Sequence, residues 1–585
     1  MTWTGCGEIN TGSCLVLSTN KRIADLFDET AHLLEMEGEN PFKIRSYTQG
    51  ARVLEALDAP VEQVAAEGRL RELEGIGEAL EKKILEYLAH GRIEFLEKLR
   101  VKYPEQVIEL LRVQGLGPKR VIALYREHGI DSLERLHHAC ETGELAGIKG
   151  YGRALQDKVL ESIEFLEERR GLYRLNTALE SALELRDWLG GDGCAEMPEI
   201  AGDVRRHREV VRDVRIIASA DAPRPLLERF MRAPGVAEVV SRRPDNVTVR
   251  LNTGIPARFH AVPPAVHPFA LIHHTGSRAH TLALRQRARE QGLELGAKGL
   301  SRADGSPVPC GSEEGVYNAL GLPFVPPELR EGAGELEVGA FPQLIREGDV
   351  RGVVHCHSTW SDGVNTLEEM AREAADMGFE YLVITDHSRS AGQANGLSPE
   401  RVARQHLEID EINRRSGGVR ILKGIESDIH RDGWLDYNDS VLATFDVVIA
   451  SVHSHLEMSK DEATRRVIKA LEKPHTMILG HPTGRLLLTR PGYPLDVDKV
   501  VDAAVANGVA IEISANPRRL DMDWRHLRRA RDKGARFVIG PDAHRVEGLR
   551  NIPFGVGIAR KGWLTREDVL NCRPVEEFLK CLRKP

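Results

Sequence analysis

The chain has 585 residues, of which 41% are hydrophobic, 29% charged and 5% aromatic, and its 80 basic and 88 acidic residues give a formal net charge of −8. At roughly 150 residues per domain, this length predicts about four structural units. The acidic balance excludes a histone-like, globally basic nucleic-acid binder, so any contact with DNA must come from local basic patches.

The eight cysteines form no Cys-x-x-Cys pair, which argues against a disulfide framework or zinc finger and favours a reducing compartment. The first 18 residues lack the basic segment and long apolar run of a signal peptide. No apolar stretch approaches the roughly 18 residues of a membrane helix. We therefore expect a cytoplasmic protein with no membrane partner and a disordered tail over residues 1–19.

Residues 20–172 show helical apolar spacing almost throughout, as at Leu80, Ile84 and Leu88. Three Gly-x-Gly units interrupt this pattern, each after an apolar turn and before a helical run: Gly75 and Gly77, Gly115 and Gly117, Gly150 and Gly152. This internal repeat predicts an all-α domain of short helix pairs. Basic residues follow the second and third units: Lys119, Arg120, Arg153 and Lys158.

Three further segments are predicted after the helical domain. Residues 173–335 mix β-type and helical patterns, which predicts an α+β domain. Residues 336–348 are expected to be a linker. Over residues 349–585, seven short apolar strands alternate with helices, which predicts a parallel (β/α)7 barrel with its active residues at the carboxyl ends of the strands.

The predicted barrel strands end, one after another, in residue types that ligate metals. Six histidines, two aspartates and one glutamate are candidates: His355, His357, Asp362, His387, Glu426, His453, His481, Asp542 and His544. Imidazole suits zinc, manganese and iron, and carboxylates can bridge two ions. Any one of these histidines could be an ordinary core or surface residue. Accident is a poor explanation for the whole series, because a barrel brings these positions to one face.

These motifs resemble those of the PHP (polymerase and histidinol phosphatase) superfamily, a distorted seven-stranded barrel with a trinuclear metal centre that hydrolyses phosphoesters. Residues 357–363 and 480–485 resemble the PHP domain of bacterial family X DNA polymerases. The resemblance implies two or three divalent ions, manganese, zinc or iron, with Glu426 as a bridging, catalytic ligand. Arg485, just past His481, is expected to steady a phosphate, although a structurally idle arginine explains it equally well.

The glycine units resemble the helix-hairpin-helix motifs of family X polymerases, which hold DNA phosphates with backbone N–H groups and do not read sequence. This implies DNA contacts at the following residues: Gly75, Gly77, Gly115, Gly117, Lys119, Arg120, Gly150, Gly152 and Arg153. Lys83 matches the lysine that attacks an abasic sugar in some members. An ordinary solvated lysine is the alternative, which we favour.

Residues 173–335 resemble a nucleotidyltransferase palm and thumb, but the polymerase site departs from the family pattern. Asp203 stands where a serine would meet the triphosphate, and Asp213 is the single carboxylate kept of three. Arg215 and Arg258 stand in place of the other two. Nucleotidyl transfer needs carboxylates that hold Mg²⁺, so magnesium is expected only if polymerase activity survives.

The resemblance, which runs from about Lys21 onward, implies a metal-dependent DNA phosphoesterase of DNA repair. Its expected activity is a 3′–5′ exonuclease or the processing of 3′ ends or abasic sites, by a monomer acting on gapped, nicked or 3′-ended DNA. One alternative is an active gap-filling DNA polymerase, against which Arg215 and Arg258 argue. Another is a non-catalytic DNA-end-binding scaffold, against which the complete set of nine ligands argues.

Overall fold

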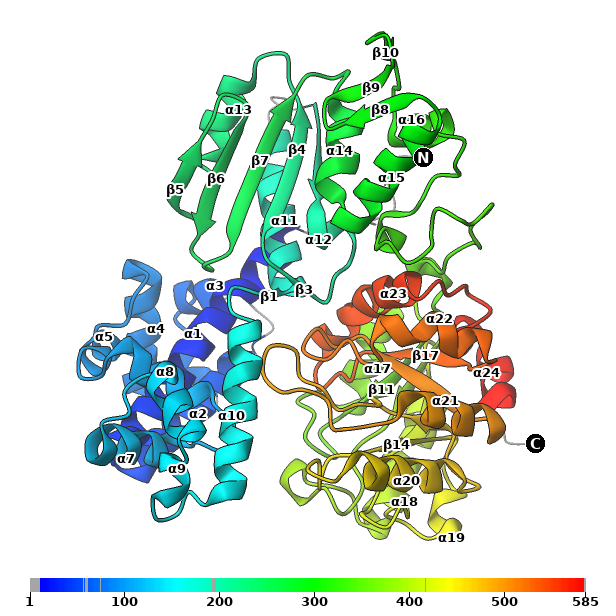
Figure 1. The fold of residues 1–585 in the computed structure, drawn as a ribbon. Helices are drawn as coiled ribbons and strands as arrows, with labels where there is room; N and C mark the ends of the chain where they lie inside the picture. The colour runs from blue at the N-terminus through cyan, green and yellow to red at the C-terminus, as the bar shows by residue number, and fades with distance from the viewer. Residues whose placement is uncertain are drawn as a thin grey trace. The chain divides into compact units, whose positions relative to one another are not determined.

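The computed structural model describes residues 11–55, 57, 61–73, 75–191, 196–415 and 417–582 (Figure 1). The chain forms two compact units, Met1–Arg170 and Gly171–Pro585. In the described part of the chain, every helix is too short or too polar to traverse a lipid bilayer.

The first unit is all-α, as its apolar spacing predicts. Its α-helices are α1 (Thr11–Met36), α2 (Pro41–Glu55), α3 (Val61–Ala66), α4 (Glu78–His90), α5 (Glu94–Arg100), α6 (Glu105–Glu109), α7 (Pro118–His128), α8 (Leu133–Glu141), α9 (Glu144–Gly147) and α10 (Arg153–Glu168). They share one core, to which Phe27, Leu54 and Ile84 contribute fully buried side chains. Helix α1 begins at Thr11, within the segment 1–19 that was expected to be a disordered tail, and residues 1–10 of that segment lie outside the described part.

The second unit begins with a mixed α+β region. Its five-stranded sheet has the order β2-β4-β7-β6-β5, formed by β2 (Glu196–Ala201), β4 (Val214–Ser219), β5 (Val236–Arg242), β6 (Asn246–Leu251) and β7 (Pro256–Val262). Strands β4 and β7 are parallel, with Arg215 opposite Arg258. Helices α11 (Leu175–Gly190), α13 (Pro223–Phe230), α14 (His267–Thr275), α15 (Arg278–Glu290) and α16 (Glu313–Ala319) accompany the sheet and the region after it.

Residues 336–348, the expected linker, are attached to the barrel that follows. Leu344 forms an antiparallel bridge with Thr565, and the N–H of Ile345 donates to the carbonyl of Leu564 at 3.0 Å. Leu344 and Ile345 are buried. Leu344 and Ile345 therefore anchor the segment to the second unit, while its other residues are exposed or half-buried.

The predicted seven-stranded barrel is confirmed. All strands are parallel and paired in chain order, from β11 (Gly352–Cys356) through β12 (Tyr381–Ile384), β13 (Arg420–Asp428), β14 (Val447–Ser451), β15 (Ile478–Leu479) and β16 (Ala510–Ser514) to β17 (Phe537–Gly540). A bridge between Cys356 and Ala543 brings the first strand to the last. Both faces of these strands are buried, because Val354, Val383 and Ile449 fill one apolar cluster while their strand neighbours pack in the cluster that includes the outer helices. This explains why the strands read as short continuous apolar runs.

The outer helices of the barrel are α17 (Leu367–Asp376), α18 (Pro399–Arg415), α20 (Lys460–Leu471), α21 (Val497–Ala506), α22 (Trp524–Asp532), α23 (Ile552–Lys561) and α24 (Val575–Leu582). Helices α22 and α23 also contact the α+β region of the same unit. Arg525 pairs with Glu209 at 2.8 Å, and Arg560 pairs with Glu328 at 2.7 Å.

Candidate metal centre

All nine predicted ligand residues converge at the carboxyl ends of the barrel strands. They form four overlapping groups whose ligand atoms lie within 4.8 Å of one another: His357, Asp362, His387 and His544; His355, His357 and Asp542; His355, Glu426 and His481; and His387, Glu426 and His453. Because several residues belong to two groups, the site is one connected cluster.

Glu426, at the end of β13, lies at the centre of this cluster. Its Oε1 is 3.0 Å from His481 Nε2, 3.2 Å from His453 Nε2 and 3.3 Å from His355 Nε2. Its Oε2 is 3.0 Å from His387 Nδ1. The two oxygens therefore face different histidines, which is the arrangement expected of a bridging carboxylate.

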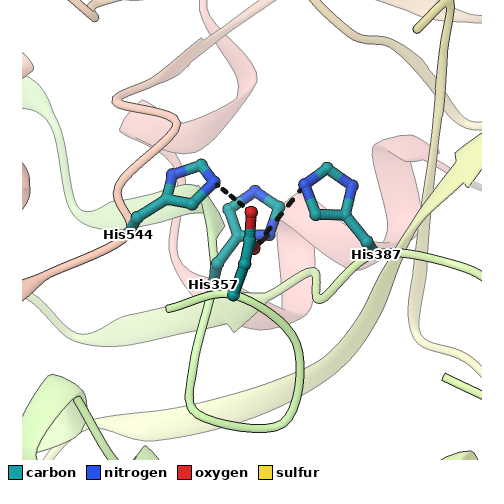
Figure 2. A group of neighbouring side chains, drawn as sticks. His357, His387 and His544 are labelled. Atoms are coloured by element: carbon teal, nitrogen blue, oxygen red, sulfur yellow. Dashed lines mark ion pairs between the residues drawn. The ribbon is translucent and has the colours of Figure 1, made fainter. Parts of the chain in front are cut away.

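A second part of the cluster surrounds Asp362, which follows β11. Its carboxylate lies 3.4 Å from His544 Nε2 and 3.7 Å from His387 Nε2. Figure 2 shows the imidazoles of His357, His387 and His544 gathered around one space. The rings of His357 and His544 are stacked, with centroids 4.1 Å apart.

Glu512 is a carboxylate that the sequence pattern did not reveal. It lies within the apolar strand β16 and is fully buried. Its Oε1 is 2.6 Å from His355 Nδ1, and its other oxygen accepts a hydrogen bond from the N–H of His481. A carboxylate on Nδ1 fixes the tautomer that leaves Nε2 available to a metal. The sequence signal that could have identified Glu512 is its position as a lone glutamate inside an apolar strand.

Two further supporting residues were also missed. Asp428, two residues after Glu426, bonds His453 Nδ1, as Glu512 does for His355. Arg519, after β16, donates through Nε to Asp542 Oδ2 at 3.1 Å. Each contact orients a predicted ligand from behind.

The loop that carries His357 and Asp362 is held by Asp386, which is fully buried. Its carboxylate accepts hydrogen bonds from the N–H and hydroxyl of Ser358, both at 2.7 Å, and from the Gln405 amide at 2.6 Å. Burial raises the pKa of Asp386, against the effect of these bonds. The aspartate beside a candidate ligand is thus a structural residue.

Burial and mutual contacts set the charges of the cluster. Burial lowers the pKa of His357 to about 3, helped by the neighbouring imidazoles of His544 and His387, so His357 is neutral at physiological pH, as a metal ligand must be. Burial alone would raise the pKa of Glu426, but His453, His355 and other histidines hold it well below its ordinary value. Glu426 is therefore ionised.

Arg485, predicted to steady a phosphate, is bound to the loop that follows β16. Its Nε donates to the carbonyl of Arg519 at 2.9 Å and its Nη1 to Asp523 at 2.7 Å, while Nη2 donates to the carbonyl of Leu520. All three nitrogens are thus engaged by the loop after β16. Arg485 therefore supports that loop, and its phosphate-holding role stays a prediction.

The first unit places the three Gly-x-Gly units at helix starts. The first glycines, Gly75, Gly115 and Gly150, have φ of 102°, 88° and 93°, which only glycine adopts readily. The second glycines, Gly77, Gly117 and Gly152, are the N-caps of α4, α7 and α10.

The basic residues beside these turns are available to a ligand. Lys119, Arg153 and Lys158 are exposed. Arg120 is also exposed, and it donates to the carbonyl of Gly115 at 2.7 Å, so part of its guanidinium supports the second turn.

Lys83 lies on α4, with Nζ 4.4 Å from the centroid of the Phe95 ring. Burial lowers its pKa, and the cations of Lys43 and Lys98 add to this effect. The neighbouring Lys82 differs, since it pairs with Glu78 at 2.8 Å. The lyase role of Lys83 stays a prediction.

In the α+β region, the single retained carboxylate is engaged by the two arginines. Asp213 is buried, bonds Arg215 through both oxygens at 2.9 and 3.2 Å, and lies 3.1 Å from Arg258 Nε. Asp203 pairs with Arg206. The site therefore holds guanidinium groups against its one buried carboxylate.

Four parts of the chain match known domain families: a helix-hairpin-helix domain (residues 18–93), a SAM-like helix-hairpin-helix tandem (107–164), the DNA polymerase beta thumb (270–331) and the PHP domain (354–516). A probable phosphatase of Thermoanaerobacter sp. (strain X514) is 28% identical to this chain over 39% of the chain's length. A probable phosphatase of Acetivibrio thermocellus is 34% identical over 37% of the chain's length. The aligned regions cover 93% and 85% of these two phosphatases, respectively.

The DNA polymerase/3′-5′ exonuclease PolX of Bacillus subtilis (strain 168) is similar to this chain over nearly its whole length. The two are 36% identical over 567 residues, which cover 96% of this chain and 99% of the relative. Together with the helix-hairpin-helix, thumb and PHP matches, this shows that the chain belongs to the bacterial family X DNA polymerases that carry a C-terminal PHP domain.

Proposed function

We propose that this protein is a metal-dependent DNA phosphoesterase of DNA repair, a 3′–5′ exonuclease or an enzyme that processes 3′ ends or abasic sites. The observation that carries the proposal is the convergence of nine ligand-type side chains around Glu426. The Bacillus subtilis relative is named as both a polymerase and a 3′–5′ exonuclease, and the shorter relatives are named as probable phosphatases.

Divalent metal ions fit this set of side chains. Among the described residues, His355 Nε2, both ring nitrogens of His357 and Glu426 Oε2 are buried without a hydrogen-bond partner. Such atoms are costly to bury, and an ion offers the missing contact. The shared residues favour two or three ions, which these side chains would hold, and the donor types suit manganese, zinc or iron.

Ions bound in such a site lower the pKa of a coordinated water and stabilise charge on phosphate oxygens. The protein contributes a rigid set of ligands. Glu512 holds Nδ1 of His355 and Asp428 holds Nδ1 of His453, so that Nε2 of each ring faces the cluster. Arg519 holds one oxygen of Asp542 and leaves the other toward His357, 3.4 Å away.

The proposed partner is gapped, nicked or 3′-ended DNA, bound by a monomer. The helix-hairpin-helix matches and the exposed Lys119, Arg120 and Arg153 support a grip on phosphates that is indifferent to sequence. This grip belongs to the first unit, and the hydrolytic site to the second.

Nucleotidyl transfer is proposed to be lost. A Mg²⁺ ion at Asp213 would have to displace Arg215 and Arg258 from the carboxylate that they share. The competing proposal, an active gap-filling polymerase, has the name of the Bacillus relative in its favour. A non-catalytic scaffold is opposed by the nine ligand-type residues, which such a protein would not need.

A second activity, attack of Lys83 on an abasic sugar, rests on one observation. Burial beside Phe95 lowers the pKa of Lys83, which increases the neutral, nucleophilic fraction of its amine. Borohydride trapping on an abasic duplex tests it, with Lys82→Ala as control and Lys83→Ala expected to abolish the covalent product.

The main proposal is tested with a labelled primer on a gapped duplex and Mn²⁺, with and without deoxynucleoside triphosphates. We expect the primer to shorten in both reactions. A primer that grows supports the polymerase alternative, and an unchanged primer supports the scaffold.

A further inference from the structure

Two joined loops at the carboxyl ends of neighbouring barrel strands each carry an arginine, and one of these arginines contacts the metal cluster. Arg490 lies on the loop of residues 480–496, which follows β15, and Arg519 lies on the loop of residues 515–523, which follows β16. The loops are joined by a hydrogen bond from the N–H of Leu487 to the carbonyl of Arg518 at 2.7 Å.

Arg519 links this pair to the cluster. Its Nε donates to Asp542 Oδ2 at 3.1 Å, and Asp542 Oδ1 lies 3.4 Å from His357 Nε2. Within the described residues, the two terminal nitrogens of Arg519 form no hydrogen bond, although its side chain is only 19% exposed. Up to four N–H groups are thus left to a ligand next to the cluster.

Arg490 forms no ion pair with a carboxylate of the described residues. Its Nη2 donates to the carbonyl of Gly484 at 2.9 Å, and its buried Nε has no partner among the residues that the structure describes. Burial lowers the pKa of Arg490, and the adjacent Arg519 cation adds to this. A half-buried guanidinium beside another cation is unfavourable unless an anion joins them.

Several contacts hold the two loops in place. Arg485 binds the carbonyl of Arg519 at 2.9 Å and Asp523 at 2.7 Å. Leu488 and Leu520 have φ of 61° and 43°, a strained region for such side chains. Strain held by packed surroundings is common where a site must be preorganised.

We propose that Arg490 and Arg519 bind a phosphate group of the strand that is being cleaved, at the edge of the metal cluster. This inference rests on the proposed phosphoesterase function. Two planar guanidiniums match the oxygens of one phosphate in shape and charge. The bound phosphate also neutralises the repulsion between the two cations, and the contact of Arg519 with Asp542 sets its distance from the ligands.

The direct test is the affinity of thymidine 5′-monophosphate for the full-length protein loaded with Mn²⁺, measured by calorimetry with thymidine as the uncharged control. Arg490→Met should weaken binding about tenfold, and Arg490→Lys less, because charge without the planar fork recovers part of the contact. Arg529→Met is the matched control, since Arg529 lies on the surface and pairs with Asp498 at 2.9 Å. Nucleotide affinity unchanged in Arg490→Met would overturn the proposal.

A second arm separates a strand phosphate from a free phosphate ester. If the strand is the ligand, Arg490→Met should raise KM for a 3′-labelled oligonucleotide about tenfold with kcat nearly unchanged, because the lost contact is made equally in the ground state and the transition state. An effect on the mononucleotide alone assigns the pair to a free ester and rejects the strand. Absence of hydrolysis by the unmodified protein would instead refute the phosphoesterase function. The binding measurement would still show whether Arg490 and Arg519 bind a phosphate. Thermal melting of each variant shows whether it is folded.

Discussion

Lys561 of helix α23 donates through Nζ to Glu331 Oε1 at 2.6 Å and thereby joins the barrel to the end of the thumb region. The same ammonium group donates to the carbonyls of Arg206 and Glu328 at 3.0 and 3.1 Å. Burial lowers the pKa of Lys561 to about 8, against the effect of Glu331. These bonds exist only while the barrel and the α+β region stay packed, so the metal cluster and the polymerase-like site belong to one compact unit.

Gly557 in the same helix gives a prediction about this packing. A Cβ at Gly557 would lie 2.1 Å from the Nδ1 of His207, so Gly557→Ala should lower the free energy of unfolding by about 2 kcal/mol. His207 has φ of 52°, a conformation that glycine accepts, and the double variant with His207→Gly should regain much of the loss. Denaturant unfolding tests this, with Gly339→Ala, which meets open space, as control. Additive losses in the double variant would disprove the clash.

Glu426→Gln should separate metal binding from folding. The substitution keeps the shape of the side chain but removes the charge that faces five histidines. Bound metal and hydrolysis should therefore both fall, hydrolysis by about a hundredfold or more. Metal content and primer shortening measure this. Glu457→Gln is the control, because Glu457 is 78% exposed. Full activity with intact metal content in Glu426→Gln would show that the chemistry lies elsewhere.

The nine candidate ligands were predictable because the barrel fold brings the carboxyl ends of its strands together. Strands such as β12 and β14 end in Thr385-Asp386-His387 and Ser451-Val452-His453, and parallel strands present their carboxyl ends to one face. No knowledge of side-chain contacts is needed for that inference. The fold and the cluster therefore follow from the alternation of short apolar strands and helices.

The supporting residues were not predictable in the same way. Glu512 and Arg519 act through side-chain directions that depend on how two strands pack, and sequence spacing contains no such information. Arg485 shows the same limit, since its position just past His481 did not reveal its contacts with Asp523 and two carbonyls. Local sequence locates a residue near a site but does not give the direction of a long side chain.

Primer extension should be absent at any Mg²⁺ or Mn²⁺ concentration. Asp213 already bonds Arg215 and Arg258, and a single carboxylate cannot hold two ions. The variant with Arg215→Asp and Arg258→Asp replaces both cations by carboxylates and should gain Mg²⁺ binding, measurable by calorimetry. Template-directed synthesis by the unmodified protein would contradict the proposed loss of nucleotidyl transfer.

Acid should destabilise the second unit through Glu313. Burial would raise the pKa of this carboxyl, but Arg330 and Arg205 lower it from 4.5 to about 2. Because the folded-state value is the lower one, the stabilisation, about 3 kcal/mol, is complete above pH 4.5 and is lost as the pH falls toward 2. Glu313→Gln should be less stable at neutral pH and should lose less stability on acidification. Parallel pH profiles of the two proteins would rule out this contribution.

DNA binding should depend on salt through the hairpins of the first unit and should be indifferent to base sequence. Lys119, Arg153 and Lys158 are exposed beside helix starts that present N–H groups, so they can reach phosphates but have no base edge to read. Each alanine substitution at a contacting cation should reduce the slope of log affinity against log salt by about 0.9 on duplex DNA, through lost counterion release. Lys98→Ala is the matched control, because Lys98 is an exposed lysine of the same unit that pairs with Glu94 at 2.8 Å. If the three variants at Lys119, Arg153 and Lys158 all keep the parental slope, the hairpins do not form the grip.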